Sequence, residues 1–250
     1  MRQIVLMYHD VYCRNKSESG FQNPRNYVYM ISDQTFESHL RMITEWRRSK
    51  RIPPQKILFS FDDGGGSGFT TIAPLLEKYD YKGIFFIATK YIGEQGFLTR
   101  SQIKELYDRG HLIGSHSHSH PVRLTSLSRE EIDCEWEKSQ RVLESILGFR
   151  PSVASIPNGY VSPYVLTSLA KVGICRVFTS EPTTRMAQRD GVQVYGRYVI
   201  KAGDSPRKVK KIVSSRGVRR RLLIRSTLLE LAKSILGDSY IKVRRFLIKQ

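Results

Sequence analysis

Short apolar segments alternate with amphipathic segments along the first two hundred residues of the chain. Asp33 is expected to cap the first amphipathic segment, and Ser128, with Glu131 three residues later, the fourth. This alternation is typical of a parallel α/β sheet or barrel, because a helix leads from each parallel strand to the next. The apolar segments, which we expect to be strands, cover residues 3–8, 56–61, 83–88, 111–115, 153–156, 174–179 and 192–200. The amphipathic segments, which we expect to be helices, cover residues 33–49, 70–79, 101–109, 128–147 and 163–172.

Side chains that can bind a metal follow two of the expected strands. Asp62 and Asp63 come directly after the second strand, and His116 and His120 follow the fourth. Because parallel strands end at a common edge of a barrel, we expect these side chains to meet there. Two imidazoles and one carboxylate leave an open coordination position on a divalent metal, and a second carboxylate can then take a proton from bound water. The residues therefore suggest metal-assisted hydrolysis.

Three motifs in this order resemble those of the polysaccharide deacetylases, carbohydrate esterase family four. The chain has F-S-F-D-D-G at 59–64, H-S-H-S-H-P at 116–121 and P-N-G at 157–159. The family has T-F-D-D-G, H-[ST]-x-x-H and R-x-P-Y-G at the corresponding places. The resemblance covers residues 1–200. It implies a distorted (β/α)7 barrel and an enzyme that removes an N-acyl group, usually acetyl, from a sugar.

The resemblance also implies roles for the residues that match. Asp63, His116 and His120 would bind one metal ion, and Asp62 would be the general base. Zinc is the metal expected from the ligand types, although nickel, cobalt or iron fits the same ligands. The backbone N–H of Asn158 would donate to the oxyanion of the reaction, a role that needs no side chain.

His9 is the candidate general acid. The family usually closes with L-x-x-x-H, but no histidine follows residue 121 in this chain. The segment I-V-L-M-Y-H-D at 4–10 resembles that motif, displaced to the N-terminus as in circularly permuted deacetylases. His9 would then protonate the leaving amine; the alternative is a structural histidine. His118 lies between the metal ligands and is not expected to join them.

The third motif departs from the family pattern. Ser155 stands where the family has the arginine that orients the catalytic aspartate. Arg197 is expected to supply the missing cation, with Arg185 as its competitor. The family's late tryptophan motif is also absent. Tyr29, in the loop before residue 33, either lines a sugar cleft or packs within the loop.

The basic residues of the chain are concentrated at its C-terminal end. The net charge is +18, and residues 201–250 hold fifteen Lys or Arg against three acidic residues. We therefore expect a deacetylase-like catalytic domain at 1–200 and a basic helical extension at 201–250. Apolar residues at helical spacing over 218–236 predict a helix that either packs on the barrel or lies on anionic lipid. Its basic residues include Arg219, Arg220, Arg221, Lys233, Lys242, Arg244 and Arg245.

Composition bounds the class of protein. The three cysteines, Cys13, Cys134 and Cys175, are odd in number and widely spread, which argues against a disulfide framework. No secretory signal is recognisable at the N-terminus, so a cytoplasmic location, with contact to the membrane left open, is expected. A nucleic-acid-binding function is disfavoured, because no nucleic-acid motif accompanies the positive charge.

The sequence therefore predicts a metal-dependent hydrolase that removes an N-acyl group, most often N-acetyl, from a sugar. The expected substrate is an N-acylated sugar, lipid- or nucleotide-linked, in surface-glycan or lipopolysaccharide precursor metabolism. A deformylase or an O-deacetylase on the same scaffold is the alternative. A catalytically dead glycan-binding relative is the third hypothesis, and the intact set of two aspartates and two histidines argues against it.

Overall fold

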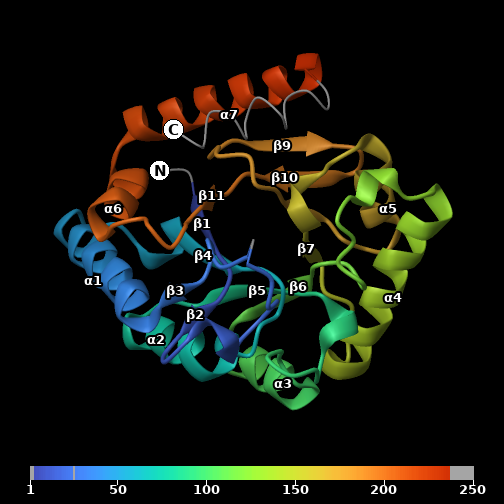
Figure 1. The fold of residues 1–250 in the computed structure, drawn as a ribbon, viewed down its shortest axis with the longest axis horizontal. Coiled ribbons are helices and arrows are strands. Elements are labelled where there is room, and N and C mark those ends of the chain that lie inside the picture. The colour runs from blue at the N-terminus through green and yellow to red at the C-terminus, as the bar shows by residue number, and fades with distance from the viewer. Residues whose placement is uncertain (1–2, 25, 237–250) are drawn as a thin grey trace.

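The computed structural model describes residues 3–24 and 26–236, in which helices surround a curled sheet (Figure 1). The sheet order is β11-β1-β4-β5-β6-β7-β8-β10-β9, and every neighbouring pair is parallel except β10 and β9. The predicted α/β fold is confirmed. The strands are β1 (Ile4–Tyr8), β4 (Ile57–Phe61), β5 (Gly83–Ile87), β6 (Leu112–Ser115), β7 (Val153–Ser155), β8 (Arg176–Phe178), β9 (Met186–Arg189), β10 (Val192–Tyr195) and β11 (Tyr198–Val199), with a separate parallel pair of β2 (Val11–Tyr12) and β3 (Ile31–Ser32).

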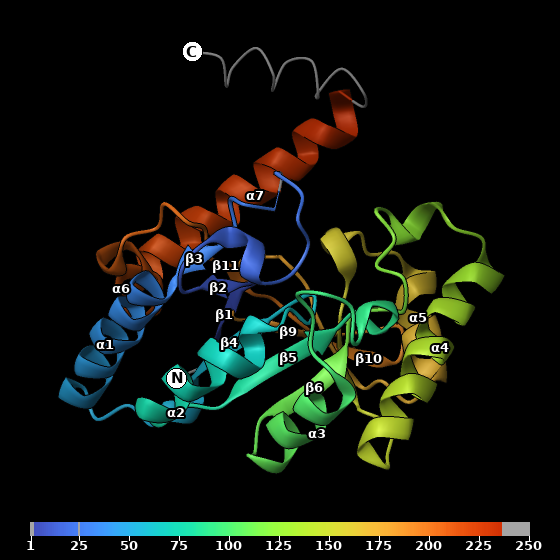
Figure 2. The same ribbon diagram turned by 60° about the horizontal axis from the view of Figure 1, so that its bottom comes forward.

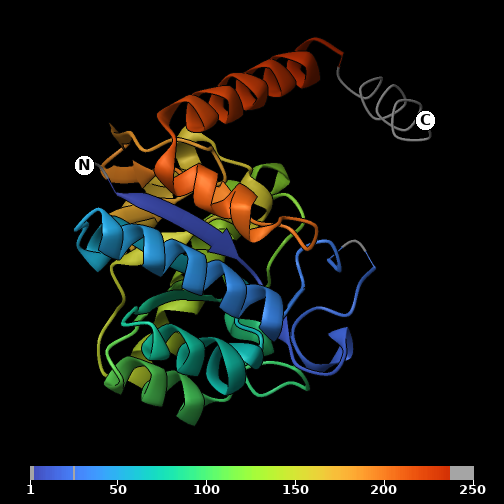
Figure 3. The same ribbon diagram turned by 90° about the vertical axis from the view of Figure 1, so that its left-hand side faces the viewer.

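Helices form the outer layer of the molecule. Six of them lie around the curled sheet, while the far end of α7 extends away from the other elements (Figures 2 and 3). The α-helices are α1 (Asp33–Ser49), α2 (Ala73–Lys78), α3 (Arg100–Asp108), α4 (Arg129–Leu147), α5 (Pro163–Lys171), α6 (Pro206–Ser214) and α7 (Arg216–Leu236). Short helical turns are η1 (Lys16–Glu18), η2 (Pro54–Lys56), η3 (Gly68–Ile72), η4 (Thr89–Tyr91), η5 (Leu124–Ser126) and η6 (Pro157–Gly159).

The helix ends follow from local side-chain chemistry. Ser128 caps α4 as predicted: its Oγ accepts the N–H of Glu131, and the Glu131 carboxylate accepts the N–H of Ser128. Helix α1 is capped by Ser32, whose Oγ accepts the N–H of Thr35. The expectation that Asp33 is this cap is wrong by one residue, because the serine hydroxyl already satisfies that backbone donor.

The segment at 192–200 is two strands, and the prediction of a single one there is wrong. Strand β10 pairs with β8, whereas β11 pairs with β1 near the other edge of the sheet. The chain breaks its extended course at Gly196, where an added Cβ would lie 2.3 Å from the carbonyl oxygen of Glu181. The sheet is therefore a half-barrel, and among the described residues no strand pairing joins its edge strands β11 and β9.

The apolar core lies between the sheet and the helices. Strands β1 and β5 are buried at every residue, as expected for parallel strands covered on both faces. Val209, Ile212 and Val213 of α6 belong to the same core as β1 and α1, so the core includes residues on both sides of position 200. Val218 and Leu222 pack the beginning of α7 against that core.

The predicted helix over 218–236 lies within α7 and is confirmed. The predicted basic residues Lys242, Arg244 and Arg245 lie outside the described residues. Of the helices in the described part of the chain, none has the length and apolar character needed to cross a bilayer.

Candidate metal centre

The predicted metal ligands meet at the C-terminal edge of the parallel strands. Asp63 follows β4, and His116 and His120 belong to the loop that follows β6. The Asp63 Oδ1 atom lies 3.4 Å from His116 Nε2 and 3.3 Å from His120 Nε2. One ligand atom from each residue lies within 4.8 Å of the others, and Asp63 and His116 are buried.

The backbone around these ligands is held in an uncommon conformation. Asp63, Ser117 and His120 have φ angles of 77°, 63° and 54°, in the left-handed region that non-glycine residues rarely adopt. Hydrogen bonds fix the loop: Ser117 Oγ accepts the N–H of His120 at 3.1 Å, and the Glu135 carboxylate of α4 accepts the N–H groups of His118 and Ser119. Strained conformations of this kind persist where the surroundings impose them, often at functional sites.

His118 stays outside the ligand set, in agreement with the sequence. Its Nδ1 atom lies 3.0 Å from the Thr89 hydroxyl, and the backbone N–H of Thr89 donates to the carbonyl of Ser117. The segment is a turn rather than a helix, so His116 and His120 approach the same ligand position through the turn geometry.

Arg197 forms a bidentate ion pair with Asp62 inside the protein. Its two terminal nitrogens lie 2.6 Å and 2.8 Å from the two carboxylate oxygens, and both side chains are almost completely buried. Burial alone would raise the pKa of Asp62, but the Arg197 guanidinium and the nearby His116 outweigh it and hold the pKa below its usual range. Arg197 thus occupies the place predicted for it, whereas its competitor Arg185 is exposed.

The sequence marked Ser155 only as the residue in place of the family arginine and gave it no role in the site. Its hydroxyl lies 3.2 Å from Asp62 Oδ1 and 2.6 Å from His116 Nδ1, and its carbonyl oxygen lies 3.0 Å from the same His116 nitrogen. The side chain is fully buried. A serine between two apolar residues gives no sequence signal for such contacts, because they depend on β7 lying beside β6.

His9 enters the same cavity from the end of β1. The cavity has a volume of about 240 Å³, and its lining includes His9, Asp62, Asp63, His116, His120 and Asn158. The ring of Tyr29 stacks on that of His9 at 4.7 Å, so Tyr29 lines the cavity rather than only packing within its loop. His9 Nδ1 is buried and has no hydrogen-bond partner among the described residues. Burial lowers the pKa of His9 despite the nearby aspartates.

Asn158 is exposed at the cavity wall with a φ of 55°. Its position is compatible with the predicted oxyanion role of its backbone N–H, which stays a prediction.

Asp10 holds together two loops beside the site, and it was not identified from the sequence. Its Oδ1 atom accepts hydrogen bonds from Ser19 Oγ at 2.5 Å and Ser67 Oγ at 2.9 Å. Burial raises the pKa of Asp10 to about 6. The carboxylate packs so closely against Gly20 and Gly65 that a Cβ at either would lie 1.9 Å from one of its oxygens. Asp10 therefore ties the loop after β1 to the loop after Asp63.

The donor set fits a divalent metal ion. Because the Ser155 carbonyl can only accept, the hydrogen of His116 lies on Nδ1, which leaves the Nε2 lone pair directed to Asp63. Two imidazole nitrogens and a carboxylate suit zinc and its neighbours in the first transition row.

Known proteins share both the sequence pattern and the fold. A family model described as polysaccharide deacetylase matches residues 49–177. The Bacillus subtilis protein YxkH, which carries the name of a polysaccharide deacetylase, is 26% identical over 80% of this chain and 72% of its own length. The peptidoglycan-N-acetylmuramic acid deacetylase PdaA of the same organism is 32% identical, but over 50% of this chain and 46% of its own. The chain thus spans about half the length of that relative.

Two solved structures show the similarity of the fold. The deacetylase PplD of Streptococcus pyogenes superposes with a TM-score of 0.69 at 21% identity, over 85% of this chain and 98% of that one. IcaB from Ammonifex degensii gives 0.67 at 20% identity, over 86% and 97%. The expected α/β fold of the deacetylase type is confirmed, with a half-barrel sheet, whereas the circular permutation stays a prediction. With a family model that matches half of its residues, this chain belongs to the polysaccharide deacetylases, enzymes that hydrolyse carbon–nitrogen bonds of sugars.

Proposed function

We propose that this deacetylase is metal-dependent and removes an N-acetyl group from an amino sugar. The observation that carries the proposal is the buried Asp62–Arg197 pair beside the Asp63, His116 and His120 set. This arrangement keeps one carboxylate ionised next to a ligand set with room for substrate. The relatives' names agree in kind: PdaA, PgdA of Listeria monocytogenes and a Staphylococcus aureus protein are named for N-acetylmuramic acid, N-acetylglucosamine and poly-β-1,6-N-acetyl-D-glucosamine.

The residues divide the chemistry among them. A divalent ion held by Asp63, His116 and His120 supplies a Lewis acid and makes water more acidic. Asp62 accepts a proton from the attacking water, and the Asn158 backbone N–H donates to the developing oxyanion. His9 delivers a proton to the leaving amine. Burial lowers the pKa of His9, which makes its protonated ring a stronger acid toward the leaving amine.

Acetate release from defined substrates tests this function. Zinc-loaded protein is offered N-acetylated sugar nucleotides, lipid-linked sugars and chitin oligomers, with N-formyl and O-acetyl analogues beside them. We expect acetate and a free amine from at least one N-acetyl substrate, and loss of this release in Asp62→Asn. Preference for the N-formyl or O-acetyl analogue favours the alternative deformylase or O-deacetylase. Metal binding without turnover on any substrate favours the glycan-binding alternative.

The variants His9→Ala and His116→Ala distinguish the proposed general acid from the proposed metal ligands. His116→Ala should lose the bound metal. His9→Ala should keep stoichiometric metal and lower turnover about 10²–10⁴-fold, the usual range for a lost proton donor. Loss of metal in His9→Ala would contradict the acid role, because the residue would then be a ligand.

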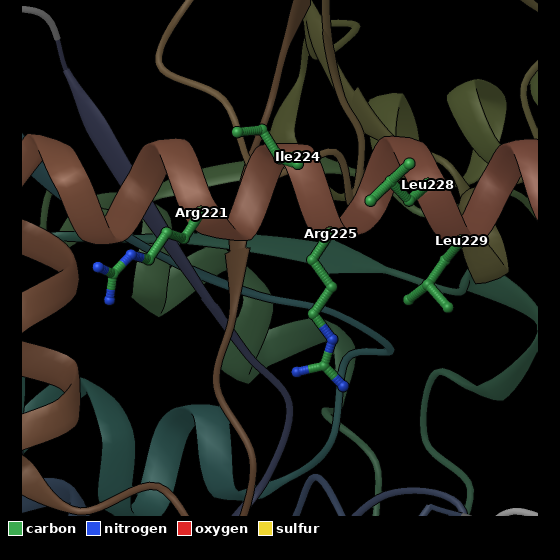
Figure 4. A pocket seen from close by; sticks show the side chains of 5 residues that line it. All are labelled: Arg221, Ile224, Arg225, Leu228 and Leu229. Atoms are coloured by element: carbon green, nitrogen blue, oxygen red, sulfur yellow. The ribbon is translucent and has the colours of Figure 1, made fainter.

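We further propose that the lipid- or nucleotide-linked precursor of a surface glycan or lipopolysaccharide is the substrate, and that α7 brings the enzyme to anionic lipid. On α7, Ile224, Leu228 and Leu229 are 49%, 60% and 40% exposed, and the arginines beside them, Arg221 and Arg225, border the same groove (Figure 4). Apolar side chains flanked by cations suit the boundary of an anionic bilayer. The cytoplasmic location expected from the sequence stays a prediction.

Sedimentation with liposomes tests the membrane contact. Wild type should bind vesicles of anionic lipid, more weakly as salt rises, and Ile224→Ser/Leu228→Ser should bind less. Phe149→Ser is the matched control, because Phe149 is an exposed apolar residue on a different surface, beside Tyr107. Equal binding to neutral and anionic vesicles, or equal binding by the two variants, would contradict the proposal.

A further inference from the structure

Ser155 lies between the proposed base and a proposed metal ligand, and the hydrogen positions there can be assigned. The Ser155 carbonyl lies 3.0 Å from His116 Nδ1 and can only accept, so this nitrogen carries the hydrogen. The same N–H reaches Ser155 Oγ at 2.6 Å, so the hydroxyl is an acceptor there. The hydroxyl hydrogen then remains free for Asp62 Oδ1 at 3.2 Å.

These bonds distinguish the two oxygens of Asp62. Among the described residues, Oδ1 accepts from both Arg197 and the Ser155 hydroxyl, whereas Oδ2 accepts from Arg197 alone. Oδ2 also lies 4.0 Å from His116 Nε2, on the side of the ligand set. Oδ2 is therefore the oxygen with fewer donors and the one nearer the ligand set.

We propose that Ser155 is a positioning residue that orients the His116 imidazole for metal and leaves Asp62 Oδ2 as the proton acceptor. It acts through these two side chains and touches no substrate in this role. The exchange of the family arginine for serine then has a physical meaning. The side chain of an arginine has five donors and no acceptor, so only its backbone carbonyl could receive the His116 N–H, without a second acceptor like the Ser155 hydroxyl. In this chain Arg197 supplies the charge beside Asp62, while the small Ser155 links Asp62 to His116.

This inference rests on the proposed metal dependence, so its first test measures metal binding without substrate. Zinc affinity is determined by competition with a chromophoric chelator for wild type, Ser155→Ala and Ser155→Thr. Removing a partner of a metal-binding histidine usually costs 10–100-fold in affinity. We expect Ser155→Ala to lose about tenfold or more, and Ser155→Thr, which keeps the hydroxyl, to recover most of that loss.

A matched control separates positioning from packing. Ser168 is also fully buried, and its hydroxyl donates to Asp133, outside the cavity. Ser168→Ala removes the same atoms and should leave zinc affinity unchanged. On a substrate that is turned over, Ser155→Ala should lower kcat and leave KM near wild type, because Ser155 orients reacting groups rather than the sugar.

Two results would overturn the proposal. One is zinc affinity within threefold of wild type in a folded Ser155→Ala. The other is equal loss in Ser155→Ala and Ser155→Thr, which would mean that size rather than the hydroxyl matters. If Ser155→Ala does not fold, Ser155→Cys, with a weak donor of similar size, should be intermediate, and unchanged affinity there counts against the proposal. Zinc binding that follows these expectations without any deacetylation would refute the proposed function and leave the role of Ser155 standing.

Discussion

Arg197 carries its charge entirely inside the protein, and the cost of that burial is offset by the Asp62 carboxylate, with further hydrogen bonds to the Thr179 carbonyl and the Ser60 hydroxyl. Removing either member of a buried pair leaves the other without compensation, which costs about 3–5 kcal/mol. We therefore expect Arg197→Ala to lower the free energy of unfolding of the metal-free protein by about that amount. The double variant Arg197→Ala/Asp62→Asn should be more stable than Arg197→Ala alone, because no charge is then left unpaired.

Denaturant unfolding in the presence of a chelator measures these differences. Arg48→Ala is the control, because the Arg48–Asp80 pair is largely exposed and should contribute under about 1 kcal/mol. An Arg197→Ala variant no less stable than Arg48→Ala would show that Asp62 is compensated by something else.

Individual residues of the site were predictable to different degrees. Asp62, Asp63, His116 and His120 could be found because their motifs are contiguous in sequence. Arg197 could be reached only by asking which cation replaces the one missing at position 155. The roles of Ser155 and Asp10 could not be found, because their hydrogen bonds depend on which loops and strands become neighbours; the motif marked position 155 only by its missing arginine.

At the scale of the elements, Asp10 joins the loops after β1 and β4. Its carboxylate packs so closely against Gly65 that this position has no room for a side chain. Gly65→Ala would place a Cβ 1.9 Å from Asp10 Oδ1, so the carboxylate or the loop would have to move. We expect a clear loss of thermal stability, accompanied by weaker metal binding because Asp63 lies in the same turn. Gly203→Ala is the control, since nothing lies within 4 Å of a Cβ there. Equal melting temperatures for the two variants would contradict this account.

The elements themselves were largely predictable, and the exceptions have separate physical causes. Repeated apolar segments identified β1, β4, β5 and β6, since buried parallel strands are apolar throughout. Strand β9 was missed because it is a mostly exposed edge strand without an apolar pattern. The division of 192–200 into β10 and β11 was missed because tight packing at Gly196, which is not visible in the sequence, interrupts the strand.

For the whole molecule, His111 links stability to pH. Its Nδ1 accepts the N–H of Gly83 at 2.9 Å, a bond that needs the neutral ring, and its Nε2–H donates to Glu77 at 3.1 Å in either protonation state. Burial lowers the pKa of His111 to about 4. Between pH 6.5 and 4 the unfolded chain therefore binds more protons than the folded one, and stability falls as pH falls.

The comparison with His111→Gln isolates this effect. The free energy of unfolding of wild type should drop between pH 6.5 and 4 by up to about 3 kcal/mol more than that of the variant. Asp10, whose pKa is raised to about 6, shifts stability in the opposite direction over part of this range, but it is present in both proteins and cancels. Parallel pH profiles for the two proteins would rule out the assignment.

The pairing of β11 with β1 has a consequence for the order in which the enzyme becomes active. His9 leaves the ribosome well before Arg197, which emerges only after Asp63, His116 and His120 have been made. A nascent chain that ends before Arg197 would have the ligands but would hold Asp62 without its cation. Catalytic competence therefore awaits the docking of β11, a contact of long sequence separation that forms late in folding.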